Sequence, residues 1–320
     1  MNPTVVTLGG ALAPEGEALL ASVGFASVAT GPYPSKAEVI ALLAKTQADA
    51  VVVRLVDRLD RDIMLASPGL RIIAKHGAGT NDIDIEAAAA LNIPVIAAVG
   101  ANAHAVAEHT IALMLALAKD MRNQDLYVRQ GGWDKALYKG REVRGSILGL
   151  VGAGQIGRLV AGMARALGMK VLGYDPYAPP GSLSAEIERV DDLPTLLRQS
   201  DIVSLHCPLT AATHGLIDEA ALALMKPSAF LINTARGEVV DQQALLAALN
   251  ARAIAGAGLD SFAPEPPGAD NPLWRLDNVI VSSHCGGVTP EARREVSLMS
   301  ARNIIAFLKG ETLAPALFVK

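Results

Sequence analysis

A glycine-rich turn between an apolar strand and a helix constrains this 320-residue chain more than any other feature. The run Ile147–Val151 leads directly into the segment GAGQIG, residues 152–157, and a helical stretch follows. In such a turn Gly152 permits the tight bend, Gly154 lets a phosphate approach the backbone, and Gly157 lets the helix pack closely. The helix N-terminus adds unpaired N–H groups and the positive end of a dipole. Strand, G-x-G-x-x-G and helix together predict a dinucleotide-binding site.

An acidic residue after the next strand indicates which dinucleotide binds. Strand 170–174 ends at Asp175, which is 18 residues after Gly157. A carboxylate in this place binds the ribose hydroxyls of NAD and repels the 2′-phosphate of NADP. The following residues, 176–178, supply no arginine that would offset the repulsion. NAD(H) is therefore the expected cofactor.

Short β-branched runs alternate with Ala- and Leu-rich helical stretches along the chain. Continuous apolar strands separated by helices predict an α/β fold with parallel sheets covered on both faces. The glycine turn lies near mid-chain, and the segment before it has its own strand–helix alternation, so we expect a second α/β domain. The expected strands are Thr4–Leu8, Ala50–Val53, Arg71–Ala74, Pro94–Ala97, Ile147–Val151, Lys170–Gly173, Ile202–Leu205, Ala229–Ile232 and Asn278–Val281.

One long helix is expected from Ala103 to Arg129. Its first part is apolar most of the way round, and such a helix must be buried on more than one side. It either crosses between domains or packs against a second subunit. The polar continuation and the loop through Gly131 and Trp133 favour the second alternative, so a homodimer is expected.

Composition limits the class of protein. Hydrophobic residues make up 51% of the chain, which is enough for a large core. The net charge of −4, without a cluster of Lys and Arg, argues against a nucleic-acid partner. The two cysteines, Cys207 and Cys285, fit a reducing compartment. No signal peptide is visible, and the longest apolar stretch, Ile111–Ala118, is far shorter than the roughly 20 residues of a membrane helix, so a cytoplasmic protein without a membrane partner is expected.

Further motifs follow one another in order along the chain. They are KHGAGTNDID (75–84), NAHAVAEHT (102–110), GAGQIG (152–157), DIVSLHCPL (201–209), NTARG (233–237), GLD (258–260), PEP (264–266) and HCGG (284–287). This set resembles the D-isomer-specific 2-hydroxyacid dehydrogenase family over essentially the whole chain. Within that family it is most similar to phosphoglycerate dehydrogenase and hydroxypyruvate/glyoxylate reductase relatives.

The resemblance implies two domains around one cleft. Residues 101–287 would form the NAD-binding Rossmann domain. Residues 1–100 and 288–320 would form a flavodoxin-like substrate domain. The crossovers near Val99-Gly100 and Gly286-Gly287 would act as hinges that close the cleft and exclude water.

The family's catalytic residues carry over to Arg236, Glu265 and His284. Hydride transfer to a 2-keto acid leaves negative charge on the carbonyl oxygen, and a histidine suits the proton transfer because its pKa lies near neutrality. Glu265 beside it would favour the imidazolium and fix the orientation of the ring. Arg236 would bind the substrate carboxylate, because a guanidinium is planar, permanently charged and able to bond in bidentate fashion.

The resemblance implies further cofactor contacts. Besides the three glycines and Asp175, Gln155 and Ile156 would cover the pyrophosphate, and His206 and Cys207 would lie near the adenosine side. Asp260 would accept from the carboxamide at the nicotinamide end, or it is a turn residue at a strand end. The other residues implied near the cofactor are Thr234, Ala235, Arg236, His284, Gly286 and Gly287.

The substrate side offers fewer signals. The loop Gly77-Ala78-Gly79 at a strand end is expected to bind a carboxylate through backbone N–H groups, or it is an ordinary tight turn. Arg54, Lys75 and His76 would neutralise a second anionic group such as a phosphate, or they are solvated surface charges. Asn102 would contact the substrate or cap the helix that follows it.

Two residues near His284 depart from the family pattern, which has proline and isoleucine where this chain has Ser283 and Cys285. The loss of the proline frees the backbone before His284. Cys285 should point away from His284 across an extended segment, as a small buried hydrophobe without a thiolate role. The histidines are scattered without paired ligand spacing, so no metal site is expected.

The implied activity is the interconversion of a small 2-keto acid and the (R)/D-2-hydroxy acid, with hydroxypyruvate, glyoxylate or 3-phosphohydroxypyruvate as substrate. Formate and phosphite dehydrogenases share the architecture, and NAD-sensing corepressors keep the fold without turnover. A Rossmann protein that binds no dinucleotide is a further alternative. The complete set of catalytic residues favours an enzyme. The expected last helix, 290–308, ends close to residue 320, so an appended regulatory domain is not expected.

Overall fold

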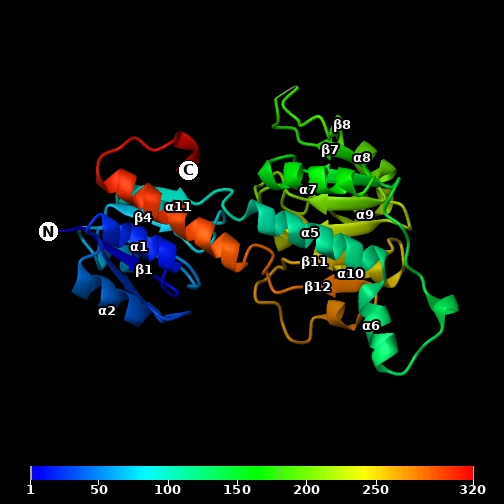
Figure 1. The fold of residues 1–320 in the computed structure, drawn as a ribbon, viewed down its shortest axis with the longest axis horizontal. Helices are drawn as coiled ribbons and strands as arrows, with labels where there is room; N and C mark the ends of the chain where they lie inside the picture. The colour runs from blue at the N-terminus through cyan, green and yellow to red at the C-terminus, as the bar shows by residue number, and fades with distance from the viewer. Residues whose placement is uncertain (1, 180, 320) are drawn as a thin grey trace. The chain divides into compact units, whose positions relative to one another are not determined.

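The computed structural model describes residues 2–179 and 181–319. It contains two compact units (Figure 1). Unit 1 combines Met1–Asn102 with Val288–Lys320, and unit 2 is Ala103–Gly287. Both units are α/β, as expected, and each is described by itself. None of the helices in the described part of the chain has the length and apolar character that a membrane-spanning segment needs.

Unit 1 is built on a five-stranded parallel sheet in the order β2-β1-β3-β4-β5. This order is that of flavodoxin-like folds, which confirms the expected fold of this part. Its central strand, β3, is apolar and fully buried, as is typical of a parallel strand covered on both faces. The elements are β1 (Thr4–Thr7), α1 (Pro14–Ser22), β2 (Ala26–Ala29), α2 (Lys36–Thr46), β3 (Ala50–Val53), α3 (Arg61–Leu65), β4 (Ile72–Lys75), α4 (Ile85–Ala90), β5 (Val95–Ala97) and α11 (Pro290–Leu308).

The C-terminal segment returns to unit 1. Helix α11 packs against α1 and β4, and Figure 1 shows it, orange to red, running beside the blue α1. Its buried residues Ala301, Ile304 and Ile305 join the core formed by β1, β3 and β4. After the helix, Phe318 bridges to Ile96 of β5, so the chain end is tied to the sheet edge.

Unit 2 is built on a seven-stranded parallel sheet in the order β12-β11-β10-β9-β6-β7-β8. Helices cover both faces, as in a Rossmann fold, and confirm the expected class. The elements are α5 (Ala103–Ala118), α6 (Met121–Arg129), β6 (Ile147–Val151), α7 (Gln155–Ala166), β7 (Lys170–Tyr174), β8 (Glu188–Arg189), α8 (Leu193–Gln199), β9 (Ile202–Leu205), α9 (Glu219–Leu224), β10 (Phe230–Asn233), α10 (Gln242–Asn250), β11 (Gly256–Leu259) and β12 (Val279–Val281).

The strand orders locate where each unit can bind a ligand. In an open parallel sheet, ligands bind outside the carboxyl ends of the strands at the point where the strand order reverses. In unit 2 that point lies between β6 and β9, and the glycine turn follows β6 directly. In unit 1 it lies between β1 and β3, and Arg54 follows β3 directly.

The expectation of one helix over Ala103–Arg129 is wrong. The chain forms α5 and α6, and Asp120 between them has a left-handed backbone with a φ of +52°. The apolar character of α5 is explained within unit 2, because α5 packs against α7, β10, β11 and β12. Helix α6 has no buried residue and carries the polar part of the segment.

Three strands were not expected from the sequence. β2 is an exposed to half-buried edge strand, and β8 is only two residues long, so neither has a strong apolar signature. β11 has the sequence GAGL and lacks the β-branched residues of a typical strand. A Cβ on Gly256 would lie 2.5 Å from the carbonyl oxygen of Asn278, so a side chain is excluded there. A Cβ on Gly258 would lie 3.1 Å from Leu113 of α5, a tight contact that favours glycine over valine.

Candidate active site

The glycine turn after β6 excludes side chains at two positions and is open at the third. Gly152 has a φ of +94°, and a Cβ there would lie 2.8 Å from the backbone nitrogen of Cys207. A Cβ on Gly157 would lie 2.5 Å from the carbonyl oxygen of Gly152, so α7 begins tightly against the turn. Gly154, the N-cap of α7, has no atom within 4 Å of such a Cβ. Neighbouring backbone therefore packs against the turn at Gly152 and Gly157, whereas the space beside Gly154 is open to a ligand.

Asp175 lies at the carboxyl end of β7, beside that turn. One carboxylate oxygen accepts from the backbone N–H of Ala153 at 3.0 Å, which links the two strand ends. The other accepts from the N–H groups of Tyr177 and Ala178, each at 3.1 Å. Residues 176–178 supply no arginine beside Asp175. Arg189 of β8, further along the chain, does lie there, and its guanidinium donates to the carbonyl of Asp175 at 3.3 Å.

His206 and Cys207 follow β9 and bring no charge to this edge of the sheet. Burial lowers the pKa of His206 to about 4, so its imidazole is neutral at neutral pH. Its Nε2 is 2.9 Å from the hydroxyl of Ser204. Its buried Nδ1 has no hydrogen-bond partner among the described residues. Burial likewise raises the pKa of the Cys207 thiol to about 11.

The loop after β10 positions Arg236, and an asparagine shapes it. The buried Asn233 amide donates to the carbonyl of Arg236 at 2.9 Å, and its oxygen accepts from the N–H of Ala235 at 3.0 Å. Thr234 is anchored to Thr110 of α5 by a hydroxyl contact of 2.9 Å. Asn233 was not singled out from the sequence, although asparagine often closes a turn by bonding its backbone two residues on.

Glu265 and His284 form a hydrogen-bonded pair. The Nδ1 of His284 is 2.7 Å from Oε2 of Glu265, and both side chains are partly exposed. The other oxygen of Glu265 accepts from the N–H of Phe262 at 2.9 Å, which fixes the carboxylate. The contact leaves the opposite ring nitrogen, Nε2, facing away from Glu265.

The pKa of Glu265 lies below its usual range. Partial burial raises this pKa, but the hydrogen bonds from His284 and Phe262 and the charges of His284 and Arg236 outweigh that effect. Glu265 is therefore a carboxylate at neutral pH. Arg236 lies close enough to contribute because Gly237 packs directly against the backbone of Phe262, where a Cβ would overlap it at 2.0 Å.

The expectation for Cys285 is wrong. The segment is not extended, because His284 has a left-handed backbone with a φ of +52°. Cys285 is consequently exposed rather than a buried hydrophobe. This conformation is stabilised by Asp260, whose oxygens accept from the N–H groups of Cys285 and Gly286, each at 2.9 Å.

Asp260, at the end of β11, is buried and accepts more hydrogen bonds than those two. The Ser282 hydroxyl donates to its Oδ1 at 2.6 Å, and the imidazole Nε2 of His109 is 2.8 Å from the same hydroxyl. The sequence predicted no metal-binding group. The structure nevertheless brings potential ligand atoms of His109, Asp260 and Cys285 within 4.8 Å of one another. The three residues are far apart in the sequence, so their spacing gave no sign that they lie close together in the fold.

Two of the three basic residues expected to bind a second anion are already engaged within unit 1. Lys75 forms a largely buried ion pair with Asp82. His76 is hydrogen-bonded to Ser297 of α11 at 3.0 Å. Burial, with the charges of Arg54 and Lys75, lowers the pKa of His76 to about 3. His76 is therefore neutral at neutral pH, and the expectation that it supplies positive charge is wrong.

Arg54 remains available, in a hollow of about 550 Å³ in unit 1. The first turns of α1 and α11 border the hollow, and Arg293 of α11 also lines it. Both guanidiniums donate to the carbonyl of Ala11, at 3.4 Å from Arg54 and 3.1 Å from Arg293. Burial and the charge of Arg293 lower the pKa of Arg54. Among the described residues, neither arginine forms an ion pair with a carboxylate.

The remaining expected substrate residues lie at the carboxyl edge of the same sheet. The loop Gly77-Ala78-Gly79 follows β4, and Gly77 has a φ of +134° with open space beside it. Its carbonyl accepts from the N–H of Ala98 after β5 at 3.0 Å. Asn102 directly precedes α5.

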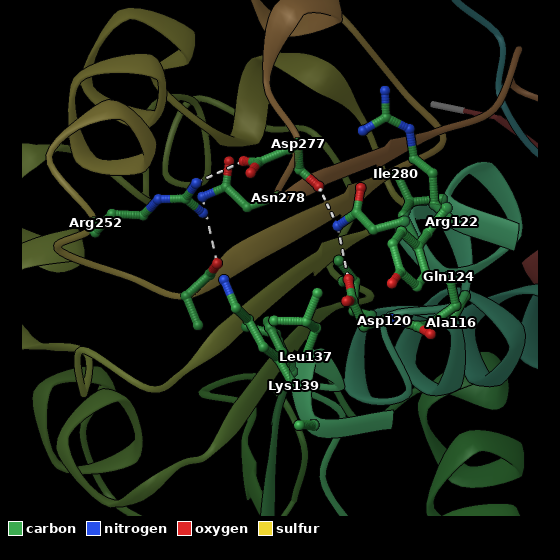
Figure 2. A pocket seen from close by; sticks show the side chains of 16 residues that line it. Ala116, Asp120, Arg122, Gln124, Leu137, Lys139, Arg252, Asp277, Asn278 and Ile280 are labelled. Atoms are coloured by element: carbon green, nitrogen blue, oxygen red, sulfur yellow. Dashed lines mark hydrogen bonds and ion pairs between the residues drawn. The ribbon is translucent and has the colours of Figure 1, made fainter. Parts of the chain in front are cut away.

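A hollow of about 800 Å³ in unit 2 lies away from all of these candidate residues (Figure 2). Its lining includes Phe230 and Asn278, at or just before the amino ends of β10 and β12. Arg252 and Asp277 also line it and form an ion pair at 2.5 Å (Figure 2). The glycine turn and His284 follow the carboxyl ends of their strands, so this hollow belongs to the opposite edge of the sheet.

Comparison with known proteins identifies the family. Residues 111–286 match the model of the D-isomer specific 2-hydroxyacid dehydrogenase NAD binding domain. A glyoxylate reductase from Thermococcus litoralis is 40% identical over 272 residues, covering 83% of this chain and 82% of that protein. The chain belongs to the D-isomer specific 2-hydroxyacid dehydrogenase family. Its cofactor class is accordingly NAD(H), as the glycine turn and Asp175 predicted.

One further sequence relative and one solved structure match most of this chain. A D-3-phosphoglycerate dehydrogenase from Methanocaldococcus jannaschii is 40% identical over 295 residues, 92% of this chain. This chain spans only 55% of the length of that relative. The TT0316 protein from Thermus thermophilus superposes with a TM-score of 0.87 at 34% identity, over 99% of this chain and all of that one.

The residues at the carboxyl edge of unit 2 fit the cofactor of this family. The open backbone at Gly154 and the N-terminus of α7 suit a pyrophosphate, and the Asp175 carboxylate at the end of β7 suits the ribose hydroxyls. The neutral His206 and Cys207 add no repulsion or attraction of their own.

Replacing Gly154 tests this assignment. Gly154→Ala should fold normally, because the backbone is extended there and the Cβ meets no atom within 4 Å. Its Cβ should block the approaching pyrophosphate and weaken NADH binding by about tenfold or more, which corresponds to at least about 1.4 kcal/mol. Fluorescence titration measures the affinity, and thermal unfolding measures stability.

Gly162→Ala is the matched control. Gly162 is exposed in α7, and a Cβ there is equally free of contacts. This variant should keep the parent affinity for NADH and gain about 0.4–1 kcal/mol of stability. Unchanged NADH binding by Gly154→Ala would show that no phosphate approaches this turn.

Proposed function

We propose that this chain is an NAD(H)-dependent oxidoreductase that interconverts a small 2-keto acid and the corresponding (R)/D-2-hydroxy acid. One observation carries the proposal: a histidine paired with a carboxylate at 2.7 Å, close to an arginine, at the edge of the NAD-binding sheet. An acid/base group and a cation for a carboxylate are the protein groups that this chemistry requires.

His284 is the residue that transfers the proton. The bound nicotinamide supplies or accepts the hydride. In the direction of reduction, the Nε2 of His284 donates a proton to the substrate carbonyl oxygen. Glu265 contacts the other ring nitrogen, so it holds the ring in place and stabilises the imidazolium. The Phe262 N–H keeps the carboxylate itself from rotating.

Arg236 binds the substrate carboxylate. In the structure its guanidinium donates to the adjacent carbonyl of Ala235 at 2.7 Å, a local contact that a carboxylate can replace with a stronger, charged one. Asp260 accepts from the carboxamide of the cofactor, and Asp175 binds the adenosine ribose and gives the preference for NADH over NADPH. These separate roles explain why the side chains follow β7, β10, β11 and β12.

The substrate carries a second anionic group, which Arg54 and Arg293 bind. Two guanidiniums without a carboxylate partner among the described residues line one hollow at the strand-order reversal of unit 1. Arg54 is half-buried and Arg293 is exposed, and Glu15 and Glu291 also line the hollow. Two guanidiniums that meet at one carbonyl nevertheless favour an anion, and phosphate matches two guanidiniums well. 3-Phosphohydroxypyruvate is therefore the favoured substrate over glyoxylate, and the loop Gly77-Ala78-Gly79 offers backbone N–H groups to a carboxylate.

Removing the imidazole tests the acid/base role. His284→Ala should lower kcat by about 10²–10⁴-fold, the usual contribution of a general acid, with little change in the Kd for NADH. Glu265→Gln should lower kcat by a smaller factor, because the imidazole stays but loses its charged partner. Stopped-flow NADH oxidation and fluorescence titration give the two quantities. Turnover retained in His284→Ala would remove the assignment.

A substrate screen tests the second anion. NADH oxidation should show a higher kcat/KM with 3-phosphohydroxypyruvate than with hydroxypyruvate or glyoxylate. Arg54→Gln should lower kcat/KM for the phosphorylated substrate by about 10–100-fold, because one hydrogen bond between charged groups contributes roughly 1.5–3 kcal/mol. Its effect on glyoxylate should be small.

Arg294→Gln is the matched control for this screen, because Arg294 lines the same hollow but pairs with Glu15 at 3.5 Å. It should retain the parent kcat/KM for all three substrates. Equal losses on glyoxylate and the phosphorylated substrate in Arg54→Gln would contradict a role in binding a distal phosphate. NADH binding without turnover on any keto acid would instead support an NAD-sensing protein. Turnover of formate or phosphite would support a formate or phosphite dehydrogenase.

A second copy of the chain covers the arm formed by α6 and residues 130–141. Several large apolar side chains of this arm are exposed to solvent, and Trp133 is 81% exposed. Exposed apolar side chains gathered on one segment mark an interaction site, and tryptophan is the residue most enriched at the centre of such interfaces. The other exposed members are Met121, Leu126, Val128, Leu137 and Tyr138.

Sedimentation velocity tests this pairing. The parent chain should sediment as a dimer at micromolar concentration, and Trp133→Ser together with Leu137→Ser should shift it towards the monomer. Tyr177→Ser is the control, because Tyr177 is 77% exposed but lies outside the arm. A monomeric parent chain, or a dimer insensitive to the double substitution, would exclude the arm as the interface.

A further inference from the structure

Three potential metal ligands from three separate elements converge beside the Glu265–His284 pair. They are His109 of α5, Asp260 at the end of β11 and Cys285 after β12. Their ligand atoms all lie within 4.8 Å of one another.

The chemistry of the three groups selects a particular kind of metal. Thiolate, imidazole and carboxylate together suit Zn²⁺, whereas Mg²⁺ and Ca²⁺ prefer oxygen ligands alone. Three protein ligands leave one tetrahedral position for water, as in open zinc sites. The group differs from ordinary surface acids, because Asp260 is only 3% exposed and faces an exposed thiol.

The separations are close to those of a bound zinc ion. Two ligands on one tetrahedral zinc are about 3.3–3.8 Å apart, given bonds of about 2.0–2.3 Å. The Nε2 of His109 and Oδ1 of Asp260 are already 3.6 Å apart. The sulfur of Cys285 lies within 4.8 Å of both, and because Cys285 is exposed its side chain can rotate to bring the sulfur closer.

Contacts around the group hold two ligands in place. A Cβ on Gly286 would lie 2.9 Å from Oδ2 of Asp260 and 3.1 Å from the ring of His109, so the backbone closes over both. The Ser282 hydroxyl donates to Asp260 and contacts His109. When zinc binds Nε2 of His109, it replaces the contact of this nitrogen with Ser282, and Ser282 keeps its bond to Asp260. Bonds of this kind orient metal ligands in established sites.

We propose that His109, Asp260 and Cys285 form a zinc site, and that zinc bound there competes with the nicotinamide end of the cofactor. The competition rests on the proposed function, in which Asp260 accepts from the carboxamide; the metal site itself does not. A carboxylate oxygen that ligates zinc is no longer available to the carboxamide, and the loop bearing His284 is tied to the metal through Cys285. Zinc would therefore be an inhibitor of this chain.

Direct metal binding tests the site without any turnover. Zinc added to the intact chain and competed with a chromophoric chelator should bind in a 1:1 ratio. Cobalt in place of zinc should give a thiolate-to-metal charge-transfer band in the near ultraviolet, together with the intense visible bands of tetrahedral cobalt. Cys285→Ser should abolish the charge-transfer band and weaken zinc binding by about 100-fold, since even partners of metal ligands contribute 10–100-fold. His109→Gln should weaken zinc binding while keeping the charge-transfer band at higher cobalt concentration.

The matched control is the other cysteine. Cys207 is buried with a raised pKa, so Cys207→Ser should leave zinc affinity and the cobalt spectrum unchanged. Zinc affinity unaffected by Cys285→Ser, or a cobalt complex without the thiolate band, would overturn the site.

Saturating NADH tests the competition separately. It should weaken zinc binding by about tenfold or more in the parent chain. Independent binding of zinc and NADH would overturn the competition. Loss of zinc binding in Cys285→Ser would still support the metal site if the chain proved inactive on every keto acid, so failure of the proposed function and failure of the zinc site give different results.

Discussion

The buried carboxylate of Asp260 is the constraint on which the arrangement of the candidate active site depends. It accepts from the hydroxyl of Ser282 and from the N–H groups of Cys285 and Gly286. A hydrogen bond to a charged group contributes roughly 1.5–3 kcal/mol, and a buried carboxylate without donors is costly. These bonds bind the loop after β12 to the end of β11. They hold His284 in the left-handed conformation that turns its ring towards Glu265.

A second constraint fixes the opposite side of the site. Asn233 bonds to the backbone of Ala235 and Arg236, and Gly237 packs against Phe262 with no room for a side chain. The loop of Arg236 and the loop of Glu265 are thereby held together. Partial burial raises the pKa of Glu265, but the hydrogen bonds from His284 and Phe262, together with the charges of His284 and Arg236, keep this pKa below its usual range. A carboxylate that is ionised at neutral pH suits the acid/base role that we propose for the histidine beside it.

The sequence predicted the regular parts of the fold well, for a physical reason. Strands such as Ala50–Val53, Ile147–Val151 and Ile202–Leu205 were located to the residue, since a parallel strand buried on both faces is apolar along most of its length. The same rule fails for β11, where the backbone of Asn278 leaves no room for a side chain at Gly256 and α5 packs tightly against Gly258. It also cannot detect the break at Asp120, because a single left-handed residue leaves no mark on hydrophobic periodicity.

The sequence by itself determined the α/β class and the NAD(H) cofactor class, because a phosphate-binding turn and its acidic partner lie within one continuous strand–helix–strand segment. Only the tertiary structure decided which of the candidate residues are charged, exposed or already paired. Lys75 is engaged by Asp82, His76 is neutral through burial, and Cys285 is exposed beside His109. Each of these properties depends on neighbours that are distant in the chain or on a backbone angle. Local sequence fixes which atoms are present, whereas solvent access and charge depend on what the fold packs around them.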